Sequence, residues 1–596
     1  MGELKYLNKY LFRYRYRLAL GAVFVIISNY FGVIPAKIIR RAFDLVNENI
    51  TLYKLFSGFS NQDSIYQIFG KTMLIFGASV LLMAILRGIF LFFMRQTIIV
   101  VSRYIEYDLK NDIYNHYQHL SLSFYRRNNT GDLMNRISED VSRVRMYVGP
   151  AIMYTINTVV LFLMVITTMA SINLKLTIFA LLPLPLMAIV IYYVNSIIHR
   201  KSENIQEQLS NLSTFTQETF SGIRVLKAYG REQRSREDFE AQSEEYKKRS
   251  MGLARVQAFF YPTVLLLAGM SVVLTVYIGG VEVKNGNITP GNIAEFIVYI
   301  NQLTFPMMSL GWVTSLIQRG AASQKRINEF MHTEPDIKSG TLKEEPIRGK
   351  VEFRNVSFTY PDTGIQALKN VSFVAESGDF IAFIGRTGSG KSTIANLLAR
   401  MYDVNAGEIL IDDRNIKDYD LHHLRDAMGY VPQEVFLFSD TISNNIGFGV
   451  NKVIEEQVFA AAKNAAVYEN IQAFPHGFET TIGERGITLS GGQKQRVSIA
   501  RAIIKEPNIM VFDDCLSAVD TKTEEEILSN LGKVMENKTS VIISHRVSSI
   551  KNADKIFVID NGVIIESGYH EALLEQKGEY FELYEKQLLE EEEISE

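Results

Sequence analysis

Cysteine is nearly absent from this chain, whose 596 residues contain only Cys515. A single cysteine excludes an intramolecular disulfide and is typical of a protein kept in a reducing compartment. Cys515 itself is expected to be a small buried hydrophobic side chain. A large net charge is absent too, because the formal charge is only −3, and this balance does not favour a nucleic acid as a partner.

Charged residues are absent from four long apolar stretches in the first 320 residues of the chain, and two further stretches are almost free of them. A helix needs roughly 20 residues to cross a bilayer, and a buried soluble helix could imitate one such stretch but not six. We therefore expect six membrane-spanning helices, at about residues 18–39, 72–94, 146–174, 176–198, 256–281 and 296–318.

Arg87 lies inside the second expected span. An ionisable residue at this depth can line a water-filled cavity that receives substrate, or it can face a neighbouring helix. The sequence leaves both interpretations open.

No cleavable signal sequence is evident at the amino terminus. Residues 4–17 are basic and amphipathic, which favours a helix lying along the inner membrane surface with its cationic side chains facing lipid headgroups. These side chains are Lys5, Lys9, Arg13, Arg15 and Arg17.

Lysine and arginine are concentrated at the amino terminus and in the connections 95–145 and 199–255. Because basic connections stay on the cytoplasmic side, we expect a multi-pass protein of the inner membrane with both termini in the cytoplasm. Each long connection is helix-patterned, and two helices of about 25 residues would project roughly 38 Å from the membrane.

A short turn is expected at the tip of each helical pair, at residues 124–132 and 218–227. In the first tip Asn128 to Gly131 interrupt the helix, and Asp132 can cap the next one. The matching lengths and positions of the tips favour a docking role over ordinary loops. The candidate docking residues are Thr130, Gly131, Asp132, Gly222 and Arg224.

A polar segment at 331–350 contains Pro335 and Pro346 and indicates a linker. It separates a first domain at 1–330 from a second at 351–585. Residues 586–596, which carry a run of four glutamates, are expected to be a solvated helix end.

Residues 385–392 form the phosphate-binding pattern G-x-x-x-x-G-K-S. An expected strand at 380–384 precedes it and an expected helix at 393–400 follows, which is the context that a P-loop requires. Backbone N–H groups of such a loop surround phosphates, and the helix N-terminus favours their negative charge. Lys391 is expected to reach the β- and γ-phosphates of ATP, and the Ser392 hydroxyl to bind Mg²⁺. The candidate ATP-binding residues here are Gly385, Arg386, Thr387, Gly388, Ser389, Gly390, Lys391, Ser392 and Thr393.

Further motifs surround the P-loop in the sequence. The apolar run 509–512 followed by Asp513 is typical of a buried strand that ends in a magnesium-binding carboxylate. Tyr360, upstream of the P-loop, is suited to stacking on adenine. Three other patterns are Leu489-Ser490-Gly491-Gly492-Gln493 before a helical run, Gln433 after Tyr-Val-Pro, and His545 after an apolar strand.

Together these motifs resemble the ABC transporters, specifically an exporter-type half-transporter in which six spans are fused to one nucleotide-binding domain. The resemblance covers nearly the whole chain. It implies a multidomain fold, in which an all-α six-span transmembrane domain with long cytosolic helical extensions precedes an α/β P-loop (RecA-like) nucleotide-binding domain with an antiparallel β subdomain and a helical signature subdomain. It also implies ATP and Mg²⁺ as cofactors, and the lipid bilayer, an amphipathic substrate and a second half-transporter as partners.

The resemblance further implies roles for single residues. Gln433 would be the Q-loop residue that links ATP to the membrane domain, and would join Ser392 and Asp513 at the magnesium ion. His545 would be the switch histidine, and the two tips would be coupling helices that contact the segment 481–486. The signature, Leu489, Ser490, Gly491, Gly492 and Gln493, would grip ATP across a dimer interface, and the D-loop would be Ser517, Ala518, Val519 and Asp520.

Asp514 departs from the family pattern, in which this position is normally the glutamate that polarises the attacking water. The side chain is shorter by one methylene, about 1.3 Å, and misplacement by about 1 Å can cost on the order of 10²-fold in rate. We therefore expect Asp514, with His545 and Gln433, to form a catalytic set that holds ATP well and hydrolyses it slowly. A shifted backbone or a second water that restores the rate is the alternative.

Asp514 also resembles the weaker site of bacterial heterodimeric multidrug exporters, in which the partner carries the glutamate. An intact Ser490 signature would then complete the competent site of that partner. The retained His545 is a departure, because some such subunits lose the switch histidine. Two other functions remain open at this point, namely a homodimeric lipid or drug flippase with two slow sites and a regulator whose ATP binding gates a membrane partner.

Overall fold

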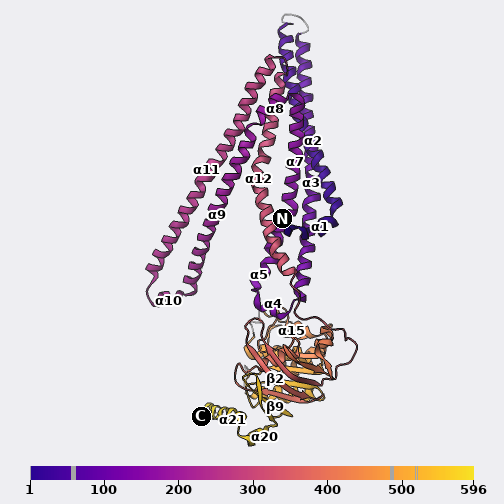
Figure 1. Cartoon of the computed structure of the whole chain (residues 1–596), viewed down its shortest axis with the longest axis vertical. Helices are drawn as coiled ribbons and strands as arrows, with labels where there is room; N and C mark the ends of the chain where they lie inside the picture. The colour runs from indigo at the N-terminus through magenta and orange to yellow at the C-terminus, as the bar shows by residue number, and fades with distance from the viewer. Residues whose placement is uncertain (1, 56–61, 484–488, 517–518, 520, 596) are drawn as a thin grey trace. The chain divides into compact units, whose positions relative to one another are not determined.

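The computed structural model describes residues 2–55, 62–483, 489–516, 519 and 521–595 (Figure 1). It divides into two compact units. The first consists of Met1–Tyr117 and Gly131–His332, and the second of Gln118–Thr130 and Thr333–Glu596. The first is helical and the second holds the described strands, which confirms the expected fold class.

Six helical stretches of the first unit are long and apolar enough to cross a membrane, as expected. Most of them extend well beyond the apolar runs, because the helical pattern continues into the basic connections. The helices are α1 (Asn8–Arg13), α2 (Arg15–Leu55), α3 (Gln62–His119), α4 (Leu122–Arg127), α5 (Thr130–Asn135), α6 (Val141–Met146), α7 (Ile152–Ile172), α8 (Leu174–Leu181), α9 (Pro183–Ser221), α10 (Ile223–Ala228), α11 (Glu232–Lys284) and α12 (Pro290–Met331), with α4 and the start of α5 in the second unit.

Two wide helical turns join α5, α6 and α7 into one continuous stretch. They are π-helical and span Arg136–Asp140 and Tyr147–Ala151. Pro150 lies in the second turn and has no N–H to donate, so the wider turn accommodates it without ending the helix.

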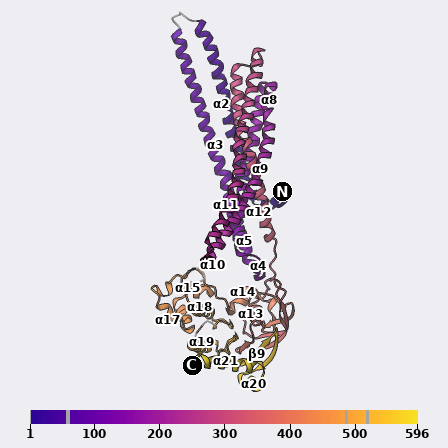
Figure 2. The same cartoon turned by 90° about the vertical axis from the view of Figure 1, so that its left-hand side faces the viewer.

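The second long connection forms a helical hairpin, in which α9 and α11 lie side by side and α10 makes the turn (Figures 1 and 2). Between the two helices, Gln208 Nε2 donates a hydrogen bond to the Gln242 carbonyl at 3.2 Å, and Arg249 pairs with Glu207 at 3.5 Å. The hairpin that the sequence predicts is therefore present.

The amino-terminal helix differs from expectation, because two of its cationic side chains are paired within the protein. Lys9 Nζ lies 2.9 Å from Asp112 Oδ2, and Arg13 Nη1 lies 3.0 Å from Asp108 Oδ2. Tyr10 donates a hydrogen bond to Asp112 at 2.6 Å. The two aspartates lie one helical turn apart on α3 and so present carboxylates to successive turns of α1.

An ion pair with a buried carboxylate ties the α5–α7 stretch to α12. Asp140 is 1% exposed and accepts a hydrogen bond from Arg326 Nε at 2.9 Å and another from Ser323 Oγ at 2.8 Å. A second guanidinium nitrogen, Nη2, also contacts Asp140. The carboxylate is satisfied only because all three donors converge on it.

The second unit contains two sheets. A four-stranded antiparallel sheet has the order β2-β1-β4-β5, and a six-stranded sheet has the order β10-β9-β3-β8-β7-β6, parallel except for β10. The strands are β1 (Val351–Thr359), β2 (Gln366–Ala375), β3 (Phe380–Ile384), β4 (Ala406–Ile411), β5 (Arg414–Asn415), β6 (Met428–Val431), β7 (Ile509–Asp513), β8 (Thr539–Ile543), β9 (Lys555–Asp560) and β10 (Val563–Gly568).

Nine α-helices accompany these strands in the described part of the second unit beyond residue 332. They are α13 (Lys391–Leu398), α14 (Leu421–Asp426), α15 (Ile442–Ile446), α16 (Glu455–Asn464), α17 (Tyr468–Gln472), α18 (Gly491–Ile503), α19 (Thr521–Met535), α20 (His570–Gln576) and α21 (Glu579–Ser595).

The six-stranded sheet is buried on both faces. Along β7, Met510 and Phe512 belong to one apolar cluster, and Ile509 and Val511 belong to the other. This alternation follows from the two-residue period of a strand, and burial of both faces explains the continuous apolar run in the sequence.

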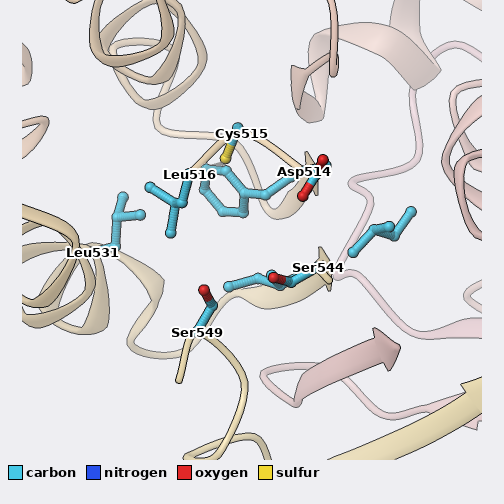
Figure 3. A pocket seen from close by; sticks show the side chains of 9 residues that line it. Asp514, Cys515, Leu516, Leu531, Ser544 and Ser549 are labelled. Carbon is cyan, nitrogen blue, oxygen red and sulfur yellow. The ribbon is translucent and has the colours of Figure 1, made fainter. Parts of the chain in front are cut away.

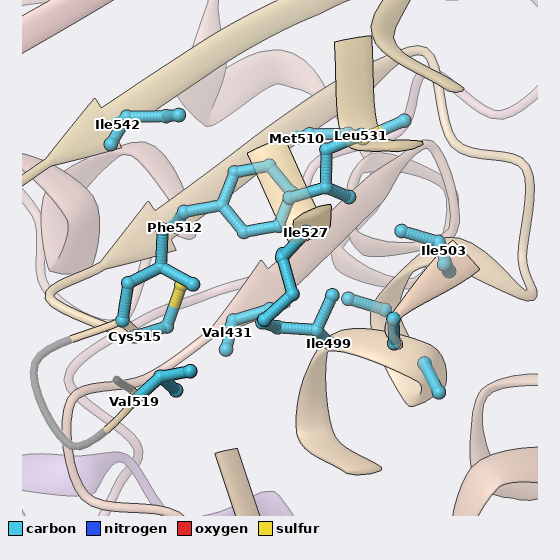
Figure 4. Close-up of a cluster of buried hydrophobic side chains, with 14 of the residues drawn as sticks. Val431, Ile499, Ile503, Met510, Phe512, Cys515, Val519, Ile527, Leu531 and Ile542 are labelled. Atoms are coloured by element: carbon cyan, nitrogen blue, oxygen red, sulfur yellow. The ribbon is translucent and has the colours of Figure 1, made fainter. Parts of the chain in front are cut away.

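Cys515 lies in the first of these clusters, beside Phe512 and Val519 (Figure 4). It is buried, which confirms the prediction of a small core side chain. Burial raises the pKa of its thiol well above the usual range, so the reactive thiolate is suppressed.

Replacing Asp140 with Asn is expected to destabilise the membrane unit by about 1–3 kcal/mol, a value kept low because Arg326 is partly exposed. The cause is the loss of the anion that compensates the Arg326 charge. The measurement is the thermal unfolding midpoint of the purified full chain in detergent. Glu139→Gln, which removes the solvent-exposed pair with Arg143, is the matched control and is expected to leave the midpoint nearly unchanged. Equal shifts for the two variants would contradict the prediction.

Candidate ATP site

The carboxyl ends of four parallel strands bring the predicted site residues to one edge of the sheet. Strand β3 pairs with β8, β8 with β7, and β7 with β6, all in parallel. In a parallel sheet these ends meet at one edge, where ligands of α/β proteins bind. Gly385 follows β3, Gln433 lies two residues beyond β6, Asp514 follows β7, and His545 lies two residues beyond β8.

The P-loop turns sharply into α13. Gly390, the residue before the helix, has a φ of 106°, and a Cβ there would lie 2.3 Å from the Ala367 carbonyl oxygen. Only glycine fits such a position. The loop therefore directs the N-terminus of α13 toward the strand ends, as a phosphate-binding loop requires.

Lys391, the first residue of α13, is 5% exposed and folds over the P-loop. Its Nζ donates hydrogen bonds to the carbonyl oxygens of Gly385 and Arg386, both at 2.8 Å. Burial lowers the pKa of Lys391 to about 8, although the charges of Asp514 and Asp513 act in the opposite direction. The ammonium is thus still protonated at neutral pH, without a direct carboxylate partner in the described residues.

Ser392 and Asp513 place two oxygen atoms close together at the expected magnesium position. Ser392 Oγ donates a hydrogen bond to Asp513 Oδ1 at 2.8 Å. Burial raises the pKa of the Asp513 carboxyl, which a bound divalent cation would offset. The pair fits Mg²⁺, which prefers oxygen ligands and is held by few protein groups together with phosphates and water.

Asp514 has the left-handed backbone conformation, with φ of 46°. Its N–H donates to the Ile543 carbonyl at 2.9 Å, and its Oδ2 accepts a hydrogen bond from Gln433 Nε2 at 3.3 Å. The structure therefore joins these two predicted catalytic residues directly.

A small cavity of about 10 Å³ adjoins Asp514 on the side toward Leu516 and Leu531 (Figure 3). Its lining is largely apolar, with Asp514, Ser544 and Ser549 as the polar exceptions. A cavity of this size is at the lower limit for one water molecule.

His545 lies within electrostatic reach of the same groups. Burial and the Lys391 charge lower the pKa of its imidazole, while the Asp514 charge opposes this shift. The neutral imidazole is thus favoured at neutral pH, and a neutral ring retains one N–H that can donate to a phosphate oxygen.

Tyr360 follows β1 and lies next to the P-loop helix, where its hydroxyl is 3.0 Å from Thr393 Oγ1. Arg126, from the first predicted tip, lies over the Tyr360 ring at 5.2 Å and over Tyr402 at 5.7 Å. Ser123, in the same tip, donates a hydrogen bond to Asp336. Sequence reasoning did not single out Arg126, because a basic residue in a turn carries no signal of such a contact.

The predicted signature forms the start of α18. Ser490 Oγ accepts from the Gln493 N–H at 3.2 Å, and Gln493 Oε1 accepts from the Ser490 N–H at 2.9 Å. This capping box explains the serine and glutamine spacing in structural terms. Ser490 is exposed and Leu489 is buried, so the polar end of the motif faces outward.

Part of the predicted site lies outside the described residues, namely Ser517, Ala518 and Asp520 of the D-loop and residues 484–486 of the segment before the signature. Val519 is described and is buried in the core. Of the second tip, Gly222 ends α9, Arg224 lies in α10, and α10 buries none of its side chains.

In the first tip, Asn128 ends α4 and Thr130 begins α5. Asp132 lies in the first turn of α5 and pairs with Arg136 at 2.7 Å. Gly131 is the second residue of that helix. The helix is interrupted at residues 128 and 129, within the predicted break, but Thr130 and Gly131 are already helical, and Asp132 lies inside the first turn of α5 instead of at its cap.

Arg87 faces helix α2. A Cβ placed on Gly32 would lie 3.2 Å from Arg87 Nε, so the missing side chain of the glycine makes room for the guanidinium. Of the two placements that the sequence leaves open, a water-filled cavity or a neighbouring helix, the structure therefore shows the neighbouring helix.

A six-span helical unit joined to a P-loop nucleotide-binding fold defines the class of ATP-driven membrane transporters. The chain belongs to the ABC transporter family and is an exporter with transmembrane and ATP-binding domains. Two family models match the chain. Residues 18–307 match the model described as the ABC transporter transmembrane region, and residues 368–517 match the model described as ABC transporter. The predicted ATPase coupled to transport is thereby confirmed.

Several relatives align over most of the chain. It is 34% identical to the multidrug resistance-like ATP-binding protein MdlA of Escherichia coli over 97% of this chain and 96% of that protein. It is 35% identical to the ATP-dependent lipid A-core flippase of Haemophilus influenzae over 85% and 86%. Among solved structures, a bacterial Atm1-family ABC exporter with ATP bound is 28% identical, with a TM-score of 0.75 over 96% of this chain and 98% of that one.

Nucleotide affinity is expected to fall as the pH rises through about 8, because Lys391 must be protonated to attract phosphate and its pKa is about 8. Above that pH, binding must take up a proton, so the dissociation constant for ATP should rise by up to about tenfold per pH unit. Between pH 7 and 7.5 it should stay nearly constant. Titration of the purified chain with a fluorescent ATP analogue in the cold, without Mg²⁺, measures this. A dissociation constant independent of pH from 7 to 9.5 would contradict the prediction.

Proposed function

We propose that the chain exports amphipathic or hydrophobic compounds, or lipids, across the cytoplasmic membrane by alternating access, as the slow-site half of a heterodimer. The observation that carries the proposal is the hydrogen bond between Gln433 and Asp514 at 3.3 Å, because it brings the shortened carboxylate together with the second residue that we propose to orient the attacking water. The names of the relatives, which include a multidrug resistance-like protein and lipid A-core flippases, support the substrate class.

The proposed chemistry is attack of water on the γ-phosphorus of ATP, which breaks the bond to the ADP oxygen and gives ADP and phosphate. Lys391 attracts the phosphates, and Ser392 and Asp513 would hold Mg²⁺, which neutralises phosphate charge when bound. Asp514 and Gln433 orient the water, and His545 donates a hydrogen bond to the γ-phosphate. The carboxylate of the shorter aspartate side chain lies farther from the attacking water than that of a glutamate would, so hydrolysis in this pocket is slow.

Two exposed apolar surfaces support assembly with a second half-transporter. In the hairpin tip around α10, Phe220, Val225 and Tyr229 are 68%, 62% and 77% exposed. In the second unit, Phe438 stacks on Phe448 with ring centroids 4.6 Å apart, and both remain exposed just beyond the Q-loop. Exposed aromatic side chains of this kind mark docking sites. We propose that such a tip docks on the nucleotide-binding domain of the partner subunit.

The signature supports the same assembly. Ser490 is exposed at the N-terminus of α18, where a helix end attracts phosphate. We propose that this end closes over the ATP bound by the partner, which supplies the catalytic glutamate. A homodimer with two slow sites is the second candidate. A regulator that gates a membrane partner is a weaker one, because Arg126 of the first tip contacts Tyr360, as a coupling element would.

We also propose that both termini and the nucleotide-binding domain lie in the cytoplasm. The basic connections 95–145 and 199–255 support this orientation.

Restoring the missing methylene tests the slow pocket. Asp514→Glu is expected to raise ATP hydrolysis by at least about tenfold, because the longer side chain brings the carboxylate to the water. Phosphate release by the transporter isolated from its native membrane, with any partner it retains, measures the change. Asp513→Glu is the control and is expected to lower hydrolysis, since it moves a magnesium ligand. An unchanged rate in Asp514→Glu would contradict the slow-site proposal.

The division of labour is tested by two substitutions in the same isolated transporter. In a heterodimer Ser490→Ala should reduce turnover more than Asp514→Asn, because Ser490 serves the competent site of the partner. Equal damage would contradict the asymmetric assembly. The subunit composition of the isolated transporter identifies the partner, and a chain that forms an active dimer alone would favour the homodimer.

Transport itself is tested in inverted membrane vesicles. An exporter is expected to accumulate an amphipathic dye in the vesicles when ATP is added. Ser490→Ala is expected to reduce this uptake strongly, because Ser490 serves the competent site of the partner, and Asp513→Asn is expected to reduce it less, because Asp513 serves the slow pocket of this chain. ATP binding without any uptake or substrate-stimulated hydrolysis would favour the regulator.

A further inference from the structure

The carboxy-terminal helix α21 contacts two loops of the ATP site. Near its start, Glu579 Oε1 accepts a hydrogen bond from Arg386 Nε of the P-loop at 2.7 Å. About two turns later, Gln587 lies against the loop that carries His545. These two contacts are roughly 12 Å apart along one helix, given a rise of about 1.5 Å per residue.

Gln587 binds the backbone on both sides of Arg546. Its Nε2 donates to the His545 carbonyl at 2.6 Å, and its Oε1 accepts from the Val547 N–H at 2.8 Å. One side-chain amide thus supplies the donor and the acceptor that a neighbouring strand would supply in a sheet.

The switch loop needs this support because strand β8 ends at Ile543 and residues 544–549 form neither helix nor strand. Backbone polar groups that are partly buried require partners. Arg546 in the middle of the loop pairs with Glu524 of α19 at 2.7 Å. The loop is therefore fixed from two helices, α19 through a charge and α21 through Gln587.

Helix α21 is itself firmly anchored. The Glu566 carboxylate accepts hydrogen bonds from the N–H groups of Glu579 at 2.6 Å and Tyr580 at 3.2 Å, which caps the helix. Tyr580 is fully buried, and its hydroxyl is 2.8 Å from His570 Nδ1. A rigid helix can hold the switch loop in one position, which a flexible tail cannot.

We propose that Gln587 is a positioning residue that holds His545 where it meets the γ-phosphate, so that the carboxy-terminal helix contributes to the discrimination of ATP from ADP. The P-loop and Lys391 attract the β-phosphate, which both nucleotides share, and Lys391 also reaches the γ-phosphate, whereas the switch loop serves the γ-phosphate alone. Loss of the Gln587 contacts therefore weakens ATP binding selectively. The inference rests on the proposed role of His545, and the experiment separates the two.

The test uses the full chain in the isolated transporter, in the cold to suppress hydrolysis by the partner and with Asp514→Asn present to stop hydrolysis in this pocket. An azido-ATP probe labels this chain, and competition by ATP and by ADP gives the two affinities. Gln587→Met keeps the length of the side chain but removes both hydrogen bonds, and should weaken ATP competition by about five- to tenfold and ADP competition by less than about twofold. Glu585→Ala, an exposed position on the same helix, is the matched control and should change neither.

Amide hydrogen exchange provides the structural readout. Exchange of the Val547 amide should accelerate by at least about tenfold in Gln587→Met, because its acceptor is lost. An unchanged affinity for ADP shows that the variant is folded. Glu579→Gln, at the other end of the helix, removes only an exposed ion pair and should alter ATP and ADP competition together, by at most about twofold.

The following outcomes would contradict the positioning role of Gln587 or the proposed role of His545. If Gln587→Met weakens ATP and ADP binding equally, or leaves both unchanged, the positioning role is wrong. If Val547 exchange accelerates while the ATP-to-ADP ratio stays constant, the contact is structural only and the inference is wrong. His545→Ala separates the two levels, because discrimination lost in His545→Ala but kept in Gln587→Met overturns this inference alone, whereas discrimination kept in both overturns the proposed role of His545.

Discussion

The parallel pairing of β3, β8, β7 and β6 is the constraint on which the ATP site depends. It sends the carboxyl ends of these strands to one edge, so the P-loop, Asp514 and His545 meet there although they are far apart in the sequence. Two apolar clusters cover the faces of this sheet. Because both faces are closed by apolar side chains, the polar chemistry is confined to the strand ends.

At that edge the balance of charge is set by burial. Lys391 is drawn onto the carbonyl oxygens of the P-loop, and its pKa is lowered because little solvent remains to stabilise the ammonium. Burial raises the pKa of Asp513 for the same reason. Phosphate and a divalent cation would stabilise these charged forms. Ligand binding would therefore offset the free energy that burial of the charged Lys391 and Asp513 side chains costs.

The membrane unit follows a different principle, because its helices continue far beyond the apolar spans and are joined by polar contacts. Asp140 and Arg326 link the α5–α7 stretch to α12, and Lys9 and Arg13 bind carboxylates of α3. These contacts make the basic extensions parts of a rigid framework.

The six spans, the P-loop, the buried Cys515 and the fold class were predictable from the sequence, because each depends on local pattern: continuous apolar runs, a glycine-rich turn between strand and helix, or a small residue beside a core strand. The missing methylene of Asp514 was also visible in the sequence, since it concerns the identity of one residue. The roles of the site residues remain predictions, although the structure places Gln433 against Asp514 and Ser392 against Asp513.

Only the tertiary structure decided which distant side chains meet. Arg126 over Tyr360, Lys9 with Asp112, and Gln587 against the switch loop each join residues that no local pattern connects. The prediction that the cationic side chains of the amino-terminal segment face lipid headgroups was wrong for Lys9 and Arg13 for this reason, because a basic amphipathic face binds lipid headgroups or protein carboxylates equally well on sequence grounds. The sequence by itself determined the helices and strands and the polar residues that follow the strands, since periodicity and residue type are local. Their partners were decided by folding, because long-range contacts depend on the packing of the whole chain.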